Sequence, residues 1–274
     1  MEKWSTLQEA VSFVNAGDLV GLGGNGLNRA PLSLVCEIAR QNIGSLKLVT
    51  TAGGIEVDML CLSGLVHSVD AAFISNETEF GLCSHYRKAV EQGKVKANEH
   101  SCYTLISGLR AAAAGIPFMP VSGLVNTQLT EACDYFSVVS DPFTGESVPV
   151  VKSFRPDISL IHADEADEMG NVWISGPLYD DVLLSRASKQ LIVTVERKVS
   201  SSKFRFSKVK PQIPGFMVTA LVHMPRGAQP TACSPAYGVC QKGISAYKQI
   251  ENPEQLSILL QKWHISHPAL GVKT

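Results

Sequence analysis

Short apolar runs alternate along the chain with segments in which apolar residues recur every three or four positions. Such runs are typical of buried strands, and the spaced segments are typical of amphipathic helices. The predicted strands are residues 19–22, 46–51, 70–74, 95–97, 158–162, 172–174 and 191–195. Near-continuously apolar strands that alternate with helices form parallel sheets buried on both faces. The pattern therefore predicts an α/β fold with a mostly parallel sheet covered by helices on both faces.

Helix-start signals precede several of the spaced segments. Ser5 and Gln8 form a capping-box pattern, which predicts a helix that begins after Ser5 and ends near Gly17. Pro31 is suited to the first position of the next helix. The other predicted helices are residues 59–65, 86–92, 104–114, 182–187, 244–249 and 253–263.

Nothing in the chain marks a second domain, because neither a repeat nor a low-complexity linker interrupts it. We therefore predict a single domain over residues 1–274. The segment 134–155 is expected to be irregular and to cover the sheet or an interface. The uncharged stretch 111–130 contains Pro117 and Pro120, which predicts buried backbone rather than a membrane span.

The charge balance narrows the classes of partner. The chain has 24 Lys and Arg against 25 Asp and Glu, a net charge of −1. Binding to nucleic acid or to an anionic membrane surface needs a basic surplus, so neither is expected. Only 18% of the residues are charged while 45% are hydrophobic. This composition excludes disorder and predicts that another subunit covers part of the surface.

The cysteines and the start of the chain bear on location. There are seven cysteines without a C-x-x-C pair, which supports neither a disulfide framework nor a zinc cluster. The first residues lack the apolar run of a targeting peptide. We expect reduced thiols, no metal and a cytoplasmic location.

Residues 21–26 match the G-x-G-x-x-G pattern of dinucleotide sites. That site also needs an acidic residue at the end of the second strand, where this chain has Thr50 and Thr51. NAD binding is therefore disfavoured. What remains is a turn without side chains, whose backbone N–H groups could face a ligand oxygen.

Acidic residues follow several predicted strands. His162, Asp164 and Asp167 could ligate a metal, but an acidic turn closed by Gly170 and Asn171 is the favoured interpretation. Other carboxylates stand where ligand crevices form in open parallel sheets. They are Glu77, Glu79, Glu99 and Glu196.

Taken together, these segments resemble the A-type subunit of the heteromeric family I CoA-transferases, of the glutaconate CoA-transferase type. The similarity extends over nearly the whole chain in the right order. The residues that carry it are 21–24, 28–31, 86–93, 108–120, 141–145, 156–157, 161–163, 166–172, 193–196, 227–228 and 230.

The resemblance implies chemistry on acyl-CoA thioesters, with coenzyme A as part of the substrate and no permanently bound cofactor. In these transferases a glutamate attacks the thioester and passes CoA to a second carboxylate through covalent intermediates. It implies a homologous B-type subunit in a heterodimer or heterotetramer. The residues expected to bind substrate or stabilise an oxyanion are Gly23, Gly24, Asn25, Arg29, Gly53 and Gly54.

Two departures leave alternatives open. The family's nucleophile belongs to a Glu-Asn-Gly setting in the B-type subunit, and no Glu-Asn-Gly occurs here. Many relatives have Phe where this chain has Asn25. The same scaffold also serves ring-opening hydrolases and decarboxylases, for which Glu99 is the candidate base. A non-catalytic ligand-sensing domain is a third interpretation, which the absence of a DNA-binding extension disfavours.

Overall fold

The computed structural model describes residues 3–124, 127–132, 134–206 and 210–266. Met1, Glu2, Cys133 and the last eight residues of the predicted 1–274 domain lie outside this part of the chain. The six described cysteines are free thiols.

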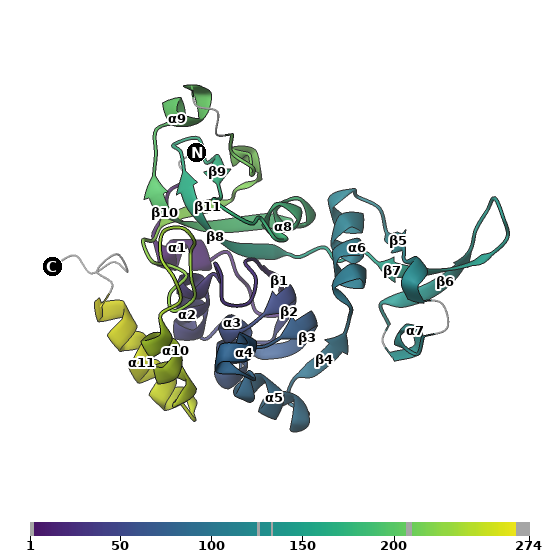
Figure 1. Cartoon of the computed structure of the whole chain (residues 1–274), viewed down its shortest axis with the longest axis horizontal. Helices are drawn as coiled ribbons and strands as arrows, with labels where there is room; N and C mark the ends of the chain where they lie inside the picture. The colour runs from purple at the N-terminus through teal and green to yellow at the C-terminus, as the bar shows by residue number, and fades with distance from the viewer. Residues whose placement is uncertain (1–2, 125–126, 133, 207–209, 267–274) are drawn as a thin grey trace.

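A central sheet organises the molecule, in the order β11-β10-β8-β1-β2-β3-β4 (Figure 1). All neighbours on this path are parallel, and only β9 pairs with β8 in the antiparallel sense. The mostly parallel sheet predicted from the sequence is therefore confirmed. Its strands are β1 (Leu19–Leu22), β2 (Leu46–Gly53), β3 (Val66–Ile74), β4 (Lys96–Glu99), β8 (Ile158–Ala166), β9 (Val172–Trp173), β10 (Gln190–Lys198) and β11 (Ala220–His223).

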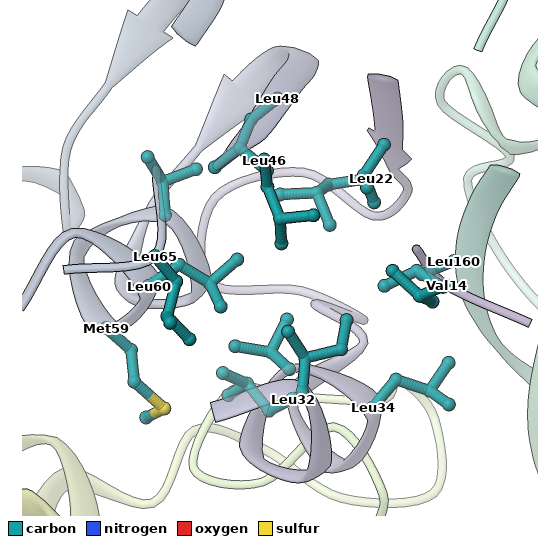
Figure 2. Close-up of a cluster of buried hydrophobic side chains, with 14 of the residues drawn as sticks. Val14, Leu22, Leu32, Leu34, Leu46, Leu48, Met59, Leu60, Leu65 and Leu160 are labelled. Atoms are coloured by element: carbon teal, nitrogen blue, oxygen red, sulfur yellow. The ribbon is translucent and has the colours of Figure 1, made fainter. Parts of the chain in front are cut away.

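One face of the sheet is covered by the helices nearest the two ends of the chain. Figure 2 shows the apolar layer between them, in which Leu22, Leu48 and Leu160 of the strands meet Leu32 and Leu60 of the helices. The helices that contribute to this layer are α1 (Leu7–Val11), α2 (Leu32–Gln41), α3 (Ile55–Leu62), α5 (Ser84–Glu91), α10 (Gln241–Lys248) and α11 (Pro253–Ser266).

The opposite face packs against α6 (Cys102–Ala113) and α8 (Asp181–Ala187). Here the alternate strand residues Val49, Ile161 and Val193 are fully buried. Because successive strand side chains point to opposite faces, these strands are apolar on both sides. Helices thus cover both faces, as the pattern predicted.

A small antiparallel sheet projects from α6 (Figure 1). It has the order β5-β7-β6 and lies within residues 116–154, which we call the arm. The prediction that residues 134–155 are irregular is wrong, because they contain both strands of a hairpin closed by a turn between Asp141 and Gly145. The stretch 111–130 is not uniformly buried either, since Phe118 is 42% exposed. The elements of the arm are β5 (Phe118–Pro120), η1 (Ser122–Leu124), α7 (Leu129–Ala132), β6 (Phe136–Ser140) and β7 (Ser147–Lys152).

Several predicted helix ends are corrected. The first helix has Thr6 as its N-cap, with Glu9 completing the capping box, and it ends at Val11. The competing pattern of Ser5 and Gln8 has similar residues one position earlier, but the Ser5 N–H donates to Leu221 O instead. Besides those of the arm, the elements not predicted are α4 (Glu77–Phe80), α9 (Ser201–Phe206), η2 (Gly215–Met217) and β11. Several strands also extend beyond their predicted bounds, and β8 continues four residues further to Ala166. None of the helices in the described ranges has the length and apolar character needed to cross a bilayer.

Candidate functional site

Three loops meet at the carboxyl ends of adjacent parallel strands. Gly26 N–H donates to Ala52 O at 2.9 Å, and Ser75 N–H donates to Gly53 O at 3.0 Å. These bonds join the loops that follow β1, β2 and β3, which we call the carboxyl-edge loops (residues 23–29, 53–54 and 75–77). In open parallel sheets, this edge is where ligands bind.

The glycine turn after β1 is too crowded for side chains. A Cβ at Gly23 would overlap the carboxylate of Asp181. Gly24 has φ +79°, and a Cβ there would lie 2.5 Å from Arg29 O. Glycine is therefore required for the close approach of the loop to its own return segment, and not only for φ.

The N–H groups of this turn are already hydrogen bonded. Gly23 donates to Leu160 O and Asn25 to Asn28 O, both at 2.9 Å. Gly24 donates to Asp181 Oδ1 at 2.9 Å. None of these three N–H groups is therefore available to stabilise an oxyanion, which is the role predicted for these residues. That Gly23, Gly24 and Asn25 lie against a substrate stays a prediction.

Arg29 does not face solvent. Its guanidinium forms an ion pair with Asp181 at 2.6 Å, with both side chains fully buried. Nη2 also donates to Pro177 O at 2.6 Å. The ion pair joins the glycine turn to the start of α8, and Asp181 holds the Gly24 N–H as well. Arg29 thus has a structural role, and its predicted contact with substrate stays a prediction.

Gly53 and Gly54 belong to the same set of loops. A Cβ at Gly53 would lie 2.7 Å from Val57 and 2.8 Å from Ile74. Gly54 lies beside the loop after β3, where its Cβ position is 3.1 Å from Ser75 O. The structure thus brings Gly53 and Gly54 together with the glycine turn, and their predicted contact with substrate stays a prediction.

Glu99 lies apart from this turn. It is the last residue of β4, which is the edge strand, and its side chain is exposed. Three strand spacings separate β4 from β1, a distance of about 14 Å. The structure therefore does not bring Glu99 next to the glycine turn.

Glu77 is the carboxylate that does reach the turn. A side chain at Gly26 would overlap Oε1 of Glu77, so this carboxylate lies against the backbone of the turn. Its position after β3 had already singled it out as a strand-end carboxylate. The family resemblance made Glu99 the candidate base of the hydrolase or decarboxylase, which stays a prediction; the distance between loops that follow different strands is not encoded locally.

Glu56 is a second carboxyl group at these loops, which the sequence did not indicate. Its Oε1 accepts the Gly54 N–H at 2.8 Å, and within the described chain Oε2 has no hydrogen-bond partner. Burial raises the pKa of Glu56 to about 7. The predicted helix began only at Met59, so Glu56 was placed in a loop; α3 in fact begins at Ile55.

The acidic segment after His162 does not converge on a metal position. Asp164 Oδ2 accepts the Ser175 N–H, and Asp167 caps a turn by accepting the Asn171 N–H at 2.8 Å. The predicted turn closed by Gly170 and Asn171 is therefore confirmed, but the prediction that His162 and Asp164 belong to a loop is wrong, because β8 continues to Ala166. His162 Nε2 instead pairs with Glu196 at 2.7 Å.

His162 and Glu196 lie near Cys233, and the three could supply ligand atoms to one ion. Burial raises the pKa of the Cys233 thiol to about 12, which disfavours the thiolate that binds metals. Tyr237 OH also donates to Glu196 Oε1 at 2.7 Å. The hydrogen bonds of Glu196 with His162 and Tyr237 connect the segment after β11 to the sheet.

A large cavity lies elsewhere on the molecule. Its volume is about 880 Å³, and it lies between α2, α11 and residues 224–230. Glu37, Arg40 and Trp263 are among its lining residues, and none of the predicted site residues lines it. It is therefore separate from the carboxyl-edge loops.

The chain is similar in sequence to proteins of known families. The model of the coenzyme A transferase family matches residues 4–224. The chain is 31% identical over 281 residues to the A-type subunit of glutaconate CoA-transferase of Acidaminococcus fermentans, covering 96% of this chain and 88% of that one. It is 33% identical to an uncharacterized protein of Archaeoglobus fulgidus, with 93% of this chain aligned, and it spans only 57% of that protein's length.

Solved structures agree with the sequence comparison. The crystal structure of glutaconate coenzyme A-transferase from A. fermentans superposes with a TM-score of 0.87 and 30% identity, covering 98% of this chain and 91% of that one. A crystal structure of a variant of the decarboxylase AibA/AibB gives a TM-score of 0.85 at 31% identity, covering 95% of this chain and all of the matched chain.

Proposed function

Since this chain belongs to the coenzyme A transferase family, we propose that it is the A-type subunit of a heteromeric CoA-transferase. The enzyme moves CoA between an acyl-CoA thioester and a small mono- or dicarboxylic acid. The observation that carries this proposal is the similarity to the corresponding chain of glutaconate CoA-transferase, which extends over 96% of the chain in sequence and 98% in structure.

The partner is a homologous B-type subunit, in a heterodimer or heterotetramer. The relative from A. fermentans is itself named as one subunit of its enzyme. Large apolar side chains are exposed near the carboxyl ends of β3 and β4, where Phe73 is 48%, Leu82 59% and Tyr103 48% exposed. Large apolar side chains exposed beside these loops can form part of an interaction surface.

The reaction proceeds through carboxylate nucleophilic catalysis, as the resemblance implies. A glutamate that the partner subunit provides attacks the thioester carbonyl, and CoA thiolate leaves to give an acyl anhydride. The thiolate then attacks the glutamyl carbonyl and releases the first carboxylic acid. The acceptor carboxylate reverses both steps, so CoA is substrate throughout and no resident cofactor is needed.

The contribution of this chain is to enclose the acyl group. The crowded backbone of the glycine turn presents a surface without side chains, and the Arg29–Asp181 ion pair holds it in place. The oxyanions that develop need N–H donors. Because the turn's own N–H groups are engaged, the partner subunit supplies them. We place the complex in the cytoplasm, in keeping with the free thiols.

The test is to co-express the chain with the partner subunit encoded by the neighbouring reading frame. The purified complex should transfer CoA from an acyl-CoA to acetate, and hydroxylamine should trap a glutamyl thioester on the partner. The chain alone should not turn over. Robust transfer by the isolated chain, or a complex that releases free CoA without needing an acceptor acid, would contradict the proposal.

The second candidate is the corresponding subunit of a decarboxylase or ring-opening hydrolase that acts on CoA thioesters. The observation in its favour is the structural similarity to the decarboxylase AibA/AibB. In this case the exposed Glu99 would be the base, and the partner subunit would lack the Glu-Asn-Gly setting.

A further inference from the structure

Two backbone features hold the Glu77 carboxylate against the glycine turn. Glu77 has φ +58°, a conformation that is unfavourable for a residue with a Cβ. Gly26 has φ +51°, and any side chain there would overlap Glu77 Oε1. Residues with a side chain rarely adopt the first conformation, and the second is possible here only for glycine. The backbone therefore defines the position of this carboxylate over the turn.

Buried polar atoms beside Glu77 have no hydrogen-bond partner in the described part of the chain. Asn76 is 1% exposed, and its Oδ1 forms no hydrogen bond although it faces Gly54, 3.6 Å from the Cβ position. Asn28 Oδ1, in the glycine turn, is also unpartnered. Because buried polar groups are normally paired, such atoms indicate a bound ligand or a partner that completes them. Both atoms are hydrogen-bond acceptors.

The cations near these loops are already engaged. Arg29 is fully buried and its charge is paired with Asp181 through Nη1, although its Nε has no hydrogen-bond partner in the described part of the chain. Lys248 donates to the carbonyl oxygen of Phe80 in α4. A ligand in contact with the carboxyl-edge loops therefore meets a carboxylate and unpartnered acceptors. A carboxylate on the ligand would gain no cationic partner from this chain and would be repelled by Glu77, which is exposed.

We propose, on the basis of the proposed function, that the acyl group held by these loops carries no free carboxylate, and that Glu77 excludes acyl groups that do. The substrate class is thereby narrowed from mono- and dicarboxylic acids to thioesters of monocarboxylic acids. Acyl groups with a hydroxyl are compatible, since a hydroxyl can donate to Glu77 or Asn76.

The test measures binding, so that it is independent of turnover. The probes are dethia analogues of butyryl-CoA and glutaryl-CoA, in which a methylene group replaces the thioester sulfur. They are titrated by calorimetry into the complex with the partner subunit, or into the chain itself if no complex forms. We expect the butyryl analogue to bind at least about ten-fold more tightly, given the cost of placing like charges together.

Variants at the same helix separate charge from shape. Glu77→Gln should reduce the preference for the butyryl analogue at least about five-fold by improving glutaryl binding. Glu77→Gly removes the carboxylate and suits the positive φ, so it should fold and behave like Glu77→Gln. Glu79→Gln, an exposed neighbour in α4, should leave the preference unchanged.

Equal or tighter binding of the glutaryl analogue by the unmodified protein would overturn the inference and leave the proposed function intact. A preference that Glu77→Gln and Glu77→Gly do not alter would also overturn it. Binding of neither analogue would overturn the inference and the proposed function together.

Discussion

Buried carboxyl groups at the carboxyl-edge loops are stabilised in two different ways. Asp181 is paired with Arg29 at 2.6 Å. Glu56 has no cation, and burial raises its pKa to about 7. Its proton is therefore bound in the folded protein at a pH where the unfolded chain has lost it.

This linkage predicts a pH-dependent stability. The contribution of Glu56 is fully present below pH 4.5, its ordinary pKa, and is lost as the pH rises through about 7. The loss amounts to about 3 kcal/mol over this window. The free energy of unfolding is measured with urea from pH 4.5 to 8. Over this range it should decline less for Glu56→Gln than for the unmodified protein, by about the same 3 kcal/mol.

The exposed residue Glu146, in the arm, provides the control. Glu146→Gln should follow the unmodified protein across the whole pH range. Parallel curves for the protein and Glu56→Gln would show that Glu56 ionises normally in the folded state.

Glu99 distinguishes the two candidate functions. It is exposed, and three strand spacings separate it from the glycine turn. For the transferase we expect Glu99→Gln to leave kcat of the assembled complex within about three-fold of the unmodified enzyme, because surface substitutions have small effects. A loss of about a hundred-fold or more, as expected for a missing general base, would favour the hydrolase or decarboxylase.

At the scale of elements, the arm is joined to the domain by aromatic packing. Phe154 is 1% exposed, and its ring packs edge-on against His100 of the domain with 5.1 Å between ring centroids. Its ring also lies against Gly108 of α6, where a Cβ would overlap it, and its N–H donates to Gly108 O at 2.9 Å. The glycine in the middle of α6 is therefore required for the ring to approach the helix.

Phe154→Ala should lower the free energy of unfolding by about 3–5 kcal/mol, the usual cost of removing a buried phenyl ring. Phe143 belongs to the same arm but is 94% exposed, so Phe143→Ala should change stability by less than about 0.5 kcal/mol. Chemical denaturation of the two variants checks the difference. Similar values for both would mean that the arm is not anchored through Phe154.

At the scale of the whole molecule, we expect the proposed partner subunit to dock over exposed apolar residues beside the carboxyl-edge loops. Phe73 and Leu82 are 48% and 59% exposed, and they lie at and beyond the carboxyl end of β3. An interface over this edge would enclose the carboxyl-edge loops between two chains. It would also supply the donors that the glycine turn cannot offer.

The double variant Phe73→Ser/Leu82→Ser should weaken assembly with the partner at least about ten-fold, since buried apolar anchors dominate the binding energy of interfaces. Ile258 is 54% exposed on α11, so Ile258→Ser serves as the control and should assemble normally. Sedimentation or surface-binding measurements give both dissociation constants. An unchanged constant for the double variant would place the interface elsewhere.

Much of the architecture was predictable because it depends on local periodicity. The parallel strands and most helices follow from apolar runs and from spaced apolar positions. These patterns can be recognised without knowing where each strand lies in the sheet. The arm was missed because β5 and β6 are short and largely exposed, and because Pro149 stands inside the apolar run of β7, where proline argues against a strand. The α1 cap was misplaced because two adjacent residues of similar chemistry compete for it.

The sequence by itself determined the α/β class, the family resemblance and the glycine turn, since each rests on residues that are neighbours in the chain. Only the tertiary structure decided the state of the site residues. Arg29 is buried because Asp181, 152 positions later, pairs with it. Glu77 rather than Glu99 reaches the turn because of the order of the strands. Burial and charge pairing depend on side chains that are distant in the sequence, so no local pattern predicts them.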